Sequence, residues 1–295
     1  MRLSLPARRT QRRALIPIIA LWALLSAGVH ADATDTLRPQ RIVSMNLCTD
    51  QLLVLLAEPA RIVSVSYLSA EPHSSHVADE VNRHHYPLNH NLPEEIIPLK
   101  PDLVVTGTFL HQAETRLIEA AGIPVEPFPV FNSLADVKGN IRKMAALIGE
   151  VQRGESLIAD MEQRQRALTA DLPAAPIRAV SYHARGYTQG ANTLSDELMN
   201  LAGFHNIARD FNIDGYGSLG LESLVLAKPE VMITSEYAPG TRSVGQYFLQ
   251  HPVLTSLFPE KAQRIELQTR DLICGGPMNL DALQTLIEYR HALAQ

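Results

Sequence analysis

Short runs rich in apolar and β-branched residues alternate with longer amphipathic runs along most of the chain. The short runs in the first half are RIVSMN, RIVSVSY, DLVVT and IPVEPF, at residues 41–46, 61–67, 102–106 and 123–128. The longer runs cover residues 49–57, 112–122 and 134–149. This alternation of strand-like and helix-like segments is typical of βαβ units, so it predicts a mostly parallel sheet covered by helices.

A long polar segment then interrupts the rhythm. Residues 151–171 place a few apolar positions among charged ones without an internal proline, which predicts one long, largely solvated helix. The rhythm resumes with strand-like runs at 177–183, 230–236 and 262–267 and helix-like runs at 193–203 and 279–293. We therefore expect an α/β protein of two Rossmann-like lobes with mostly parallel sheets. The expected parts are an N-terminal lobe at 40–150, a connecting helix at 151–172 and a C-terminal lobe at 176–295.

One phrase occurs twice, once on each side of the long helix. Residues 94–106 read EEIIPLKPDLVVT, and residues 222–234 read ESLVLAKPEVMIT. In both copies a helical turn runs into Lys-Pro, where the proline ends the helix, and a buried strand follows. Glu94 and Glu222 each lie near the start of a short helix, where the helix dipole favours a carboxylate that tends to be exposed. We interpret the repeat as a mark of two equivalent lobes.

The first 31 residues have the organisation of a secretory signal peptide. Five arginines and no acidic residue precede an apolar run, and Val29 and Ala31 place small residues at the −3 and −1 positions of a cleavage site. The run is shorter than the roughly 20 residues that span a membrane. We expect Sec-dependent export, cleavage near Ala31 and a soluble periplasmic protein, because no cysteine stands at the cleavage point to carry a lipid.

Charge and composition narrow the function classes. Removal of residues 1–31 leaves 21 basic against 31 acidic side chains, a formal charge of −10, which argues against nucleic acid as a partner. The remaining chain of about 264 residues is long enough for one large domain or two lobes. We expect two lobes and a monomer.

Several segments together resemble the periplasmic solute-binding proteins of ABC importers for iron-siderophores, haem and cobalamin. The resemblance spans residues 40–292 and is carried by RIVSMNLCTDQLLVLLA, EEIIPLKPDLVVTG, GIPVEPFP, the long helix and GANTLSDELMNLAGFHNIA. It implies two α/β lobes joined by one long helix, with a ligand cleft between them. It also implies that Glu94 and Glu222, one exposed glutamate on each lobe, meet arginines of the two permease subunits.

The function implied by this resemblance is transport rather than catalysis. The protein is expected to capture a metal chelate, either a ferric siderophore or a corrinoid, and to deliver it to the dimeric permease of an ABC transporter at the inner membrane. No cofactor is expected. The residues alone do not choose among siderophore, corrinoid and haem.

Candidate ligand residues follow from the rule that open α/β sheets bind ligands beyond the carboxyl ends of their strands. In the first lobe these positions are Asn46, Leu47, Cys48, Tyr67, Thr108 and Phe109. In the second lobe they are His183, Arg185, Tyr187, Glu236, Tyr237, Arg270 and Cys274. Aromatic rings and arginines suit a bulky, flat or anionic chelate, through stacking and charge-assisted hydrogen bonds.

The two cysteines allow three arrangements. An exported chain with two cysteines often forms one disulfide, and a bond between Cys48 and Cys274 would tie the two lobes together. A second arrangement has two free thiols near the ligand, where Met45 or Met278 could help to hold a soft metal. A third has two unrelated buried cysteines. The spacing of the residues does not decide among the three.

Two further functions compete with chelate capture. His73, His76, His84 and His85 lie in one segment, and histidines three apart on a helix can share a metal, so a receptor for free zinc, nickel or manganese ions is an alternative. A more distant one is an exported enzyme with Cys48 as its nucleophile at a helix N-terminus. Against catalysis, the chain contains no GxSxG elbow, and the RIVSMNLC segment has no glycine-rich phosphate loop.

Overall fold

The computed structural model describes residues 38–108, 112–173, 175–236 and 248–293. Residues 39–295 form one compact unit. Of the preceding segment only Arg38 is described, so the expected signal peptide lies outside the described residues. Within the described ranges, none of the helices combines the length and the hydrophobicity needed to cross a membrane.

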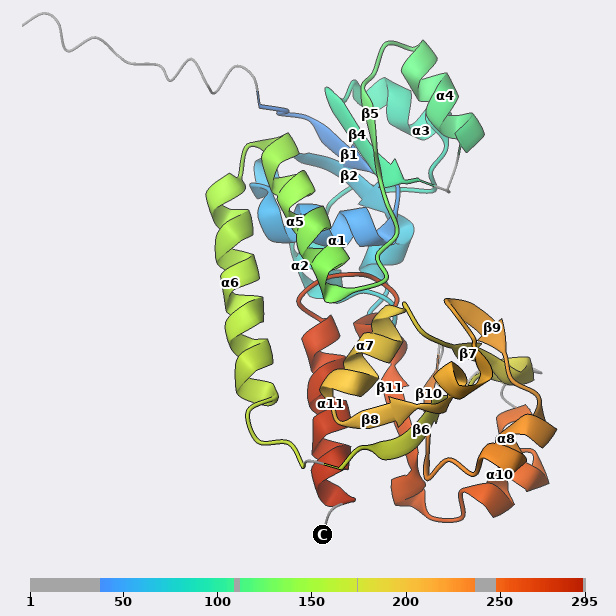
Figure 1. Ribbon diagram of the computed structural model, residues 1–295. Helices are drawn as coiled ribbons and strands as arrows, with labels where there is room; N and C mark the ends of the chain where they lie inside the picture. The colour runs from blue at the N-terminus through green and yellow to red at the C-terminus, as the bar shows by residue number, and fades with distance from the viewer. Residues whose placement is uncertain (1–37, 109–111, 174, 237–247, 294–295) are drawn as a thin grey trace, which may run out of the picture. The chain divides into compact units, whose positions relative to one another are not determined.

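The first lobe is built on a sheet whose described strands all run parallel in the order β3-β2-β1-β4-β5 (Figure 1). The strands are β1 (Ile42–Ser44), β2 (Ile62–Ser66), β3 (Leu88–Asn89), β4 (Leu103–Gly107) and β5 (Val125–Phe128). The helices are α1 (Leu47–Leu56), α2 (Ala78–His84), α3 (Pro93–Ile96), α4 (Gln112–Ala120) and α5 (Leu134–Ile148). Strand β1 lies at the centre of the sheet, so the residues after it occupy the middle of the sheet's carboxyl edge.

The second lobe repeats this design with a sheet in the order β11-β10-β6-β8, again parallel throughout its described strands. The strands are β6 (Ile177–Ser181), β8 (Phe204–Asn206), β10 (Val231–Glu236) and β11 (Arg264–Gln268), and a separate antiparallel pair consists of β7 (Tyr187–Gln189) and β9 (Tyr216–Ser218). The helices are α7 (Leu194–Leu201), α8 (Leu221–Ala227), α10 (Pro252–Leu257) and α11 (Asn279–Ala292). The predicted fold class, two α/β lobes with parallel sheets, is confirmed.

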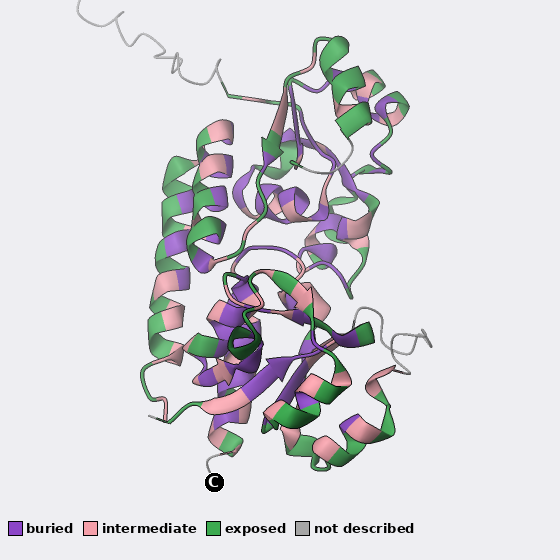
Figure 2. Ribbon diagram, turned by 45° about the vertical axis from the view of Figure 1, so that its right-hand side comes forward, coloured by how far each residue is buried: buried purple, intermediate pink, exposed green. Residues whose placement is uncertain are grey.

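Helix α6 (Val151–Leu168) connects the two lobes in sequence and packs against α5 and α11. Gly154 permits the close approach to α5, because a Cβ at this position would lie 2.5 Å from the Cβ of Ala145. Much of α6 is exposed (Figure 2), and its buried positions are Gly154, Ile158 and Met161. The expected long, largely solvated helix is therefore present, and it ends at Leu168, a little before the predicted boundary.

A single hydrophobic cluster runs through both lobes. It contains Ile42 and Val105 from the first sheet, Ile158 from α6, and Ile233 and Leu283 from the second lobe. Figure 2 shows where this core lies, with buried residues in the strands and on the inner faces of the helices. A shared core of this kind opposes large movements of one lobe against the other. Separation would expose apolar surface to water, at a free-energy cost of about 25 cal/mol for each Å².

The duplicated phrase folds in the same way in both lobes. Each copy forms a short helix that ends at a lysine in the left-handed region, with φ of 49° at Lys100 and 47° at Lys228. In each case a proline follows, and a strand then enters the sheet as β4 or β10. The helical segment of the first copy is α3 (Pro93–Ile96) continued by a 3₁₀ turn (Ile97–Leu99), whereas that of the second is the single helix α8 (Leu221–Ala227). Glu94 and Glu222 are thus structurally equivalent, and both are exposed.

Candidate ligand-binding site

The two lobes are joined where a disulfide links Cys48 of the first lobe to Cys274 of the second. We call this place, beyond the carboxyl ends of β1 and β11, the junction. Cys48 is the second residue of α1, which begins directly after β1, and Cys274 follows the short 3₁₀ turn η8 (Thr269–Asp271) after β11. The structure joins the two cysteines in a disulfide with a Cα–Cα distance of 5.0 Å. Of the three arrangements that the sequence allowed, the structure therefore has the bonded one. Because the sulfurs are bonded to each other, neither is free as a metal-binding thiolate or a nucleophile in this form.

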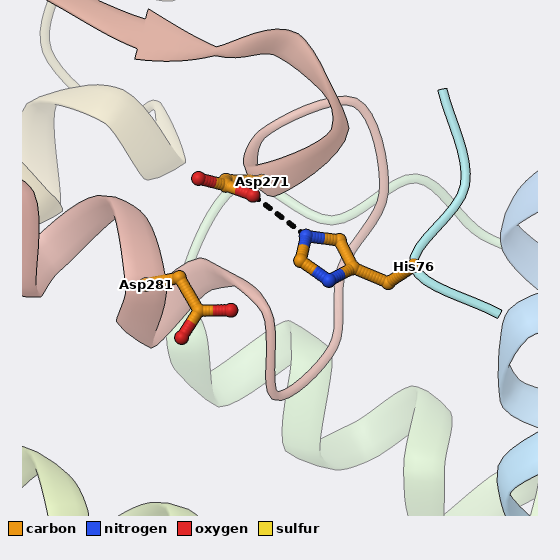
Figure 3. Close-up of side chains that lie close together, drawn as sticks. All are labelled: His76, Asp271 and Asp281. Carbon is orange, nitrogen blue, oxygen red and sulfur yellow. Dashed lines mark hydrogen bonds and ion pairs between the residues drawn. The ribbon is translucent and has the colours of Figure 1, made fainter. Parts of the chain in front are cut away.

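A second contact crosses the same junction. Nε2 of His76 lies 2.6 Å from Oδ1 of Asp271 (Figure 3). His76 is itself positioned by its backbone N–H, which donates to Oε1 of Gln51 on α1 at 3.0 Å. On the other side, Nδ2 of Asn279 donates to the backbone carbonyl of Asp271 at 2.8 Å. The junction is therefore held by the Cys48–Cys274 disulfide and by the His76–Asp271 pair. Hydrogen bonds from or to the backbone position both members of that pair.

Residues predicted for the first lobe take up different roles. The side chain of Asn46 caps α1 by accepting a hydrogen bond from the backbone N–H of Cys48 at 3.0 Å. Leu47 is buried in the core, which leaves only its backbone to face a ligand. Thr108 is exposed, and its hydroxyl donates to the carbonyl of Phe128 at 2.7 Å. Phe109 lies outside the described residues.

Tyr67 is an exposed aromatic residue at the carboxyl edge of the first lobe's sheet. It directly follows β2, is 42% exposed, and stacks on the ring of His90 with centroids 5.1 Å apart. His90 directly follows β3, and Oε2 of Glu95 accepts a hydrogen bond from its backbone N–H at 2.6 Å. The two stacked rings thus form an exposed aromatic pair across neighbouring strand ends.

The second lobe has a comparable aromatic pair. Tyr187 and Tyr216 come from the antiparallel strands β7 and β9, are 42% and 58% exposed, and stack with centroids 6.0 Å apart and an interplanar angle of 11°. Tyr187 also lies 6.0 Å from the ring of His183, which follows β6. Each lobe therefore carries one exposed aromatic pair: the first lies just beyond β2 and β3, and the second begins β7 and β9.

Charged and polar candidates lie beside this second pair. Arg185 is exposed and has a φ of 58°, within a tight turn that Gly186 continues. Burial lowers the pKa of His183 to about 4, and its Nε2 lies 3.0 Å from the hydroxyl of Ser181. The His183 imidazole is therefore neutral at pH 7. Glu236 ends β10, and Tyr237 lies outside the described residues.

Arg270 lies next to the junction. Its Nε is buried and has no hydrogen-bond partner within the described part of the chain, and the nearest carboxylate oxygen of Asp271 is 3.9 Å away. An unpaired buried N–H of a charged group is costly to maintain. Arg270 is thus a donor that an anionic group of a ligand could satisfy.

Asp50, in the first turn of α1, is fully buried. Its carboxylate accepts hydrogen bonds from the backbone N–H and the hydroxyl of Ser66. Burial raises the pKa of Asp50 to about 7, although hydrogen bonds from Ser44 and Ser66 act in the opposite direction. Asp50 therefore links the last residues of β1 and β2, Ser44 and Ser66, inside the protein and does not face a ligand.

The histidine-rich segment is not a shared metal site in the part of the chain that the structure describes. His73, His84 and His85 are exposed, His84 stacks on Tyr86, and His85 ends α2 in the left-handed region. Only His76 turns toward the second lobe, where it meets Asp271.

Three residues have functional potential that the sequence did not reveal. His90 follows a strand of only two residues, too short to show a periodic pattern. Tyr216 occurs in a turn-rich GYGS stretch. Asp281, in the first turn of α11, lies near His76, and no local pattern links these two positions.

A family model for periplasmic binding proteins matches residues 42–262. The chain belongs to this family. Members are substrate-binding proteins of transport systems that act outside the cytoplasmic membrane, rather than enzymes. The resemblance noted in the sequence is thereby confirmed.

Individual relatives are similar at modest identity. A cobalamin-binding protein of Halobacterium salinarum is 28% identical over 204 residues, which are 66% of this chain and 54% of the relative. This periplasmic binding protein thus spans about half the length of that relative. An uncharacterized ABC transporter substrate-binding lipoprotein of Bacillus subtilis, YvrC, is 23% identical over 217 residues, covering 70% of this chain and 67% of the relative.

Among solved structures, the apo form of the periplasmic heme-binding protein RhuT from Roseiflexus sp. RS-1 is similar to the whole unit. It has a TM-score of 0.70 and 26% identity, and the alignment covers 87% of this chain and 99% of that one. The likeness extends through both lobes, which supports the two-lobed fold described above.

Proposed function

We propose that this periplasmic binding protein captures a flat metal chelate of the corrinoid class between its lobes and delivers it to the permease of an ABC transporter. The observation that carries this proposal is the pair of exposed aromatic surfaces, Tyr67 with His90 in the first lobe and Tyr187 with Tyr216 in the second. The first pair directly follows the carboxyl ends of β2 and β3, the edge at which open α/β sheets bind ligands, and the second begins the strands β7 and β9 beside the parallel sheet of the other lobe. A planar macrocycle offers each lobe a face for stacking.

The chemistry around the aromatic surfaces favours the same ligand class. Aromatic stacking contributes about 0.5–1.5 kcal/mol beyond the burial of area. Arg185 and Arg270 can donate charge-assisted hydrogen bonds to acidic or amide groups at the rim of a macrocycle. Relatives named for cobalamin and for haem support a tetrapyrrole-type ligand. A ferric siderophore is the second candidate, since the same arginines suit its anionic groups.

Delivery to a permease is the second part of the proposal. Glu94 and Glu222 occupy equivalent, exposed positions on the two lobes, as expected for two docking points on a two-fold transporter. An exposed ion pair contributes only about 0.2–1 kcal/mol, so two such points would orient the protein on the permease more than they would hold it there. Export by a cleaved signal peptide, a soluble periplasmic form and a monomeric state are parts of the same proposal.

The test is direct binding of defined chelates. The purified protein is titrated with cyanocobalamin, with haem and with a ferric hydroxamate siderophore, and binding is followed by the absorbance of each chelate and by thermal unfolding. A ligand present at a hundred times its dissociation constant adds about 2.7 kcal/mol of stability. A shift with the corrinoid supports the proposal, whereas a shift with the siderophore alone replaces it with the second candidate.

Variants connect binding to the aromatic surfaces. We expect Tyr67→Ala and Tyr187→Ala each to raise the dissociation constant about threefold to tenfold, which corresponds to the loss of one stacking interaction. Leu117→Ala removes an exposed apolar side chain from α4 and serves as the control. If both tyrosine variants bind like the control, the aromatic surfaces are not the site.

A further inference from the structure

Three potential metal ligands converge at the lobe junction. His76 precedes α2 in the first lobe, Asp271 ends η8 in the second, and Asp281 lies in the first turn of α11. One ligand atom from each of these residues lies within 4.8 Å of the other two (Figure 3). We propose that His76, Asp271 and Asp281 form a site for a divalent first-row transition-metal cation that fastens the two lobes together, separate from the metal of any transported chelate.

The three side chains stand on well-supported backbone. The backbone N–H of His76 donates to Gln51 of α1, and the carbonyl of Asp271 accepts from Asn279, the first residue of α11. The nearby disulfide between Cys48 and Cys274 fixes the segments that carry these groups. A site built in this way loses little conformational entropy when a cation binds, because most of its ordering is already present.

The Asp271 carboxylate has an oxygen that can accept a cation. Its side chain is only 8% exposed, and within the described residues its one hydrogen bond comes from His76 to Oδ1. An ionised carboxylate has about four acceptor positions, so the bond from His76 leaves most of them open. The oxygen Oδ2, which accepts no hydrogen bond there, can bind a cation without breaking an existing interaction.

Asp281 contributes in a similar way from the edge of the site. Nη2 of Arg164 on α6 donates to its Oδ1 at 2.6 Å. No hydrogen bond reaches Oδ2 of Asp281 from any described residue, so this oxygen remains for a metal. The guanidinium groups of Arg164 and Arg270 offset the charge of the two aspartates. We therefore expect a dissociation constant in the micromolar range, since affinity rises with the number of uncompensated ligand charges.

The donor set determines which cations fit. Nitrogen and carboxylate ligands bind zinc at about 2.0–2.2 Å in tetrahedral geometry, so two ligand atoms of one cation lie about 3.4 Å apart. The ligand atoms here lie within 4.8 Å of one another, so metal binding requires the side chain of Asp281, which is 40% exposed, to turn toward the other two residues. One imidazole and two carboxylates suit Zn²⁺ or Co²⁺, whereas Mg²⁺ and Ca²⁺ prefer oxygen ligands alone. Water would complete the coordination shell.

The test uses metal salts alone, without any chelate. The purified protein is stripped with a chelator, kept free of reductant so that the cysteines stay bonded, and titrated with ZnCl₂ by calorimetry. CoCl₂ is added in parallel, because its visible absorption reports the ligand geometry. We expect one Zn²⁺ per chain and little response to MgCl₂ or CaCl₂. No Zn²⁺ binding at 100 µM, a concentration above the expected micromolar range, would overturn the proposal.

Substitutions locate the bound ion. Asp271→Asn and Asp281→Asn keep the shape of each side chain and should weaken Zn²⁺ binding at least tenfold. His73→Ala and His84→Ala remove exposed histidines of the same segment and should leave it unchanged. Binding that survives both aspartate variants but is lost in a histidine control would place the ion on the surface of the histidine-rich segment. Because these titrations contain no chelate, their outcome does not depend on whether the proposed function holds.

Discussion

Arg41 and Arg178 occupy equivalent positions in the two lobes and make the same backbone contacts. Asp102 accepts a hydrogen bond from the backbone N–H of Arg41 at 2.9 Å, and Glu230 accepts one from that of Arg178 at 3.1 Å. The return bonds, from the N–H of Asp102 and of Glu230 to the arginine carbonyls, measure 3.0 and 2.8 Å. In each lobe the acidic residue that follows Lys-Pro is thus hydrogen-bonded in both directions to the start of the first strand. Each arginine also donates from Nη2 to the last carbonyl of the helical segment that carries the exposed glutamate, to Leu99 at 2.6 Å and to Ala227 at 3.3 Å.

The equivalence of the two glutamates leads to a prediction about transport. Reversing both charges, in Glu94→Arg with Glu222→Arg, should abolish uptake of the chelate into cells while leaving its dissociation constant unchanged. Each single variant should retain part of the uptake, because one docking point remains. Uptake of labelled chelate and binding by the purified variant are the two measurements.

A matched control is available in α2. Asp79 is an exposed acid in the first turn of that helix, so Asp79→Arg changes the net charge as a single docking variant does without touching either glutamate. Uptake that falls equally in Asp79→Arg would indicate a general effect of charge. Loss of chelate binding in the double glutamate variant would show that these residues belong to the ligand site.

The disulfide is expected to dominate the stability of the unit. Cys48 and Cys274 are 226 residues apart, and in the chain-entropy model the closure of so long a loop stabilises the folded state by up to about 5 kcal/mol. We expect dithiothreitol to lower the free energy of unfolding by about 2–5 kcal/mol, as measured by urea denaturation. The double variant Cys48→Ser with Cys274→Ser should unfold like the reduced protein and should not respond to the reductant.

His183 predicts a loss of stability on acidification. Burial lowers its pKa to about 4, below the unfolded value of about 6.5, so the unfolded chain binds more protons between these two pH values. The contribution of His183 is therefore complete above pH 6.5 and is lost as the pH falls toward 4. The stability advantage of the wild type over His183→Gln should shrink across this window, by an amount on the order of a few kcal/mol.

Asp50 predicts the opposite dependence. Burial raises its pKa to about 7, so the folded chain binds more protons than the unfolded one between about pH 3.8 and pH 7. The contribution of Asp50 is complete below pH 3.8 and is lost as the pH rises through 7. The advantage of the wild type over Asp50→Asn should therefore shrink with rising pH. Urea denaturation of both variants at pH 4.5 and pH 7 checks the two signs, and parallel slopes would contradict both assignments.

Much of the fold was accessible from local pattern. The alternation of strand-like and helix-like runs predicted the parallel sheets, and the Lys-Pro phrase predicted the equivalence that Lys100 and Lys228 show in their backbone angles. The rule for strand carboxyl ends also named Tyr67 and Tyr187 as positions beyond the strands. These features depend on hydrophobic periodicity and on the restricted backbone of proline and of the residue before it, which short stretches of sequence express directly.

The contacts across the junction were decided only by the tertiary structure. The bond between Cys48 and Cys274, the pair of His76 with Asp271 and the proximity of Asp281 all join segments that are far apart in the chain. Each partner occupies its position because β1 and β11 end at the same junction, a consequence of how two separate sheets pack. Periodicity carries no information about that packing, because it records which face of each element is buried and not which element covers it.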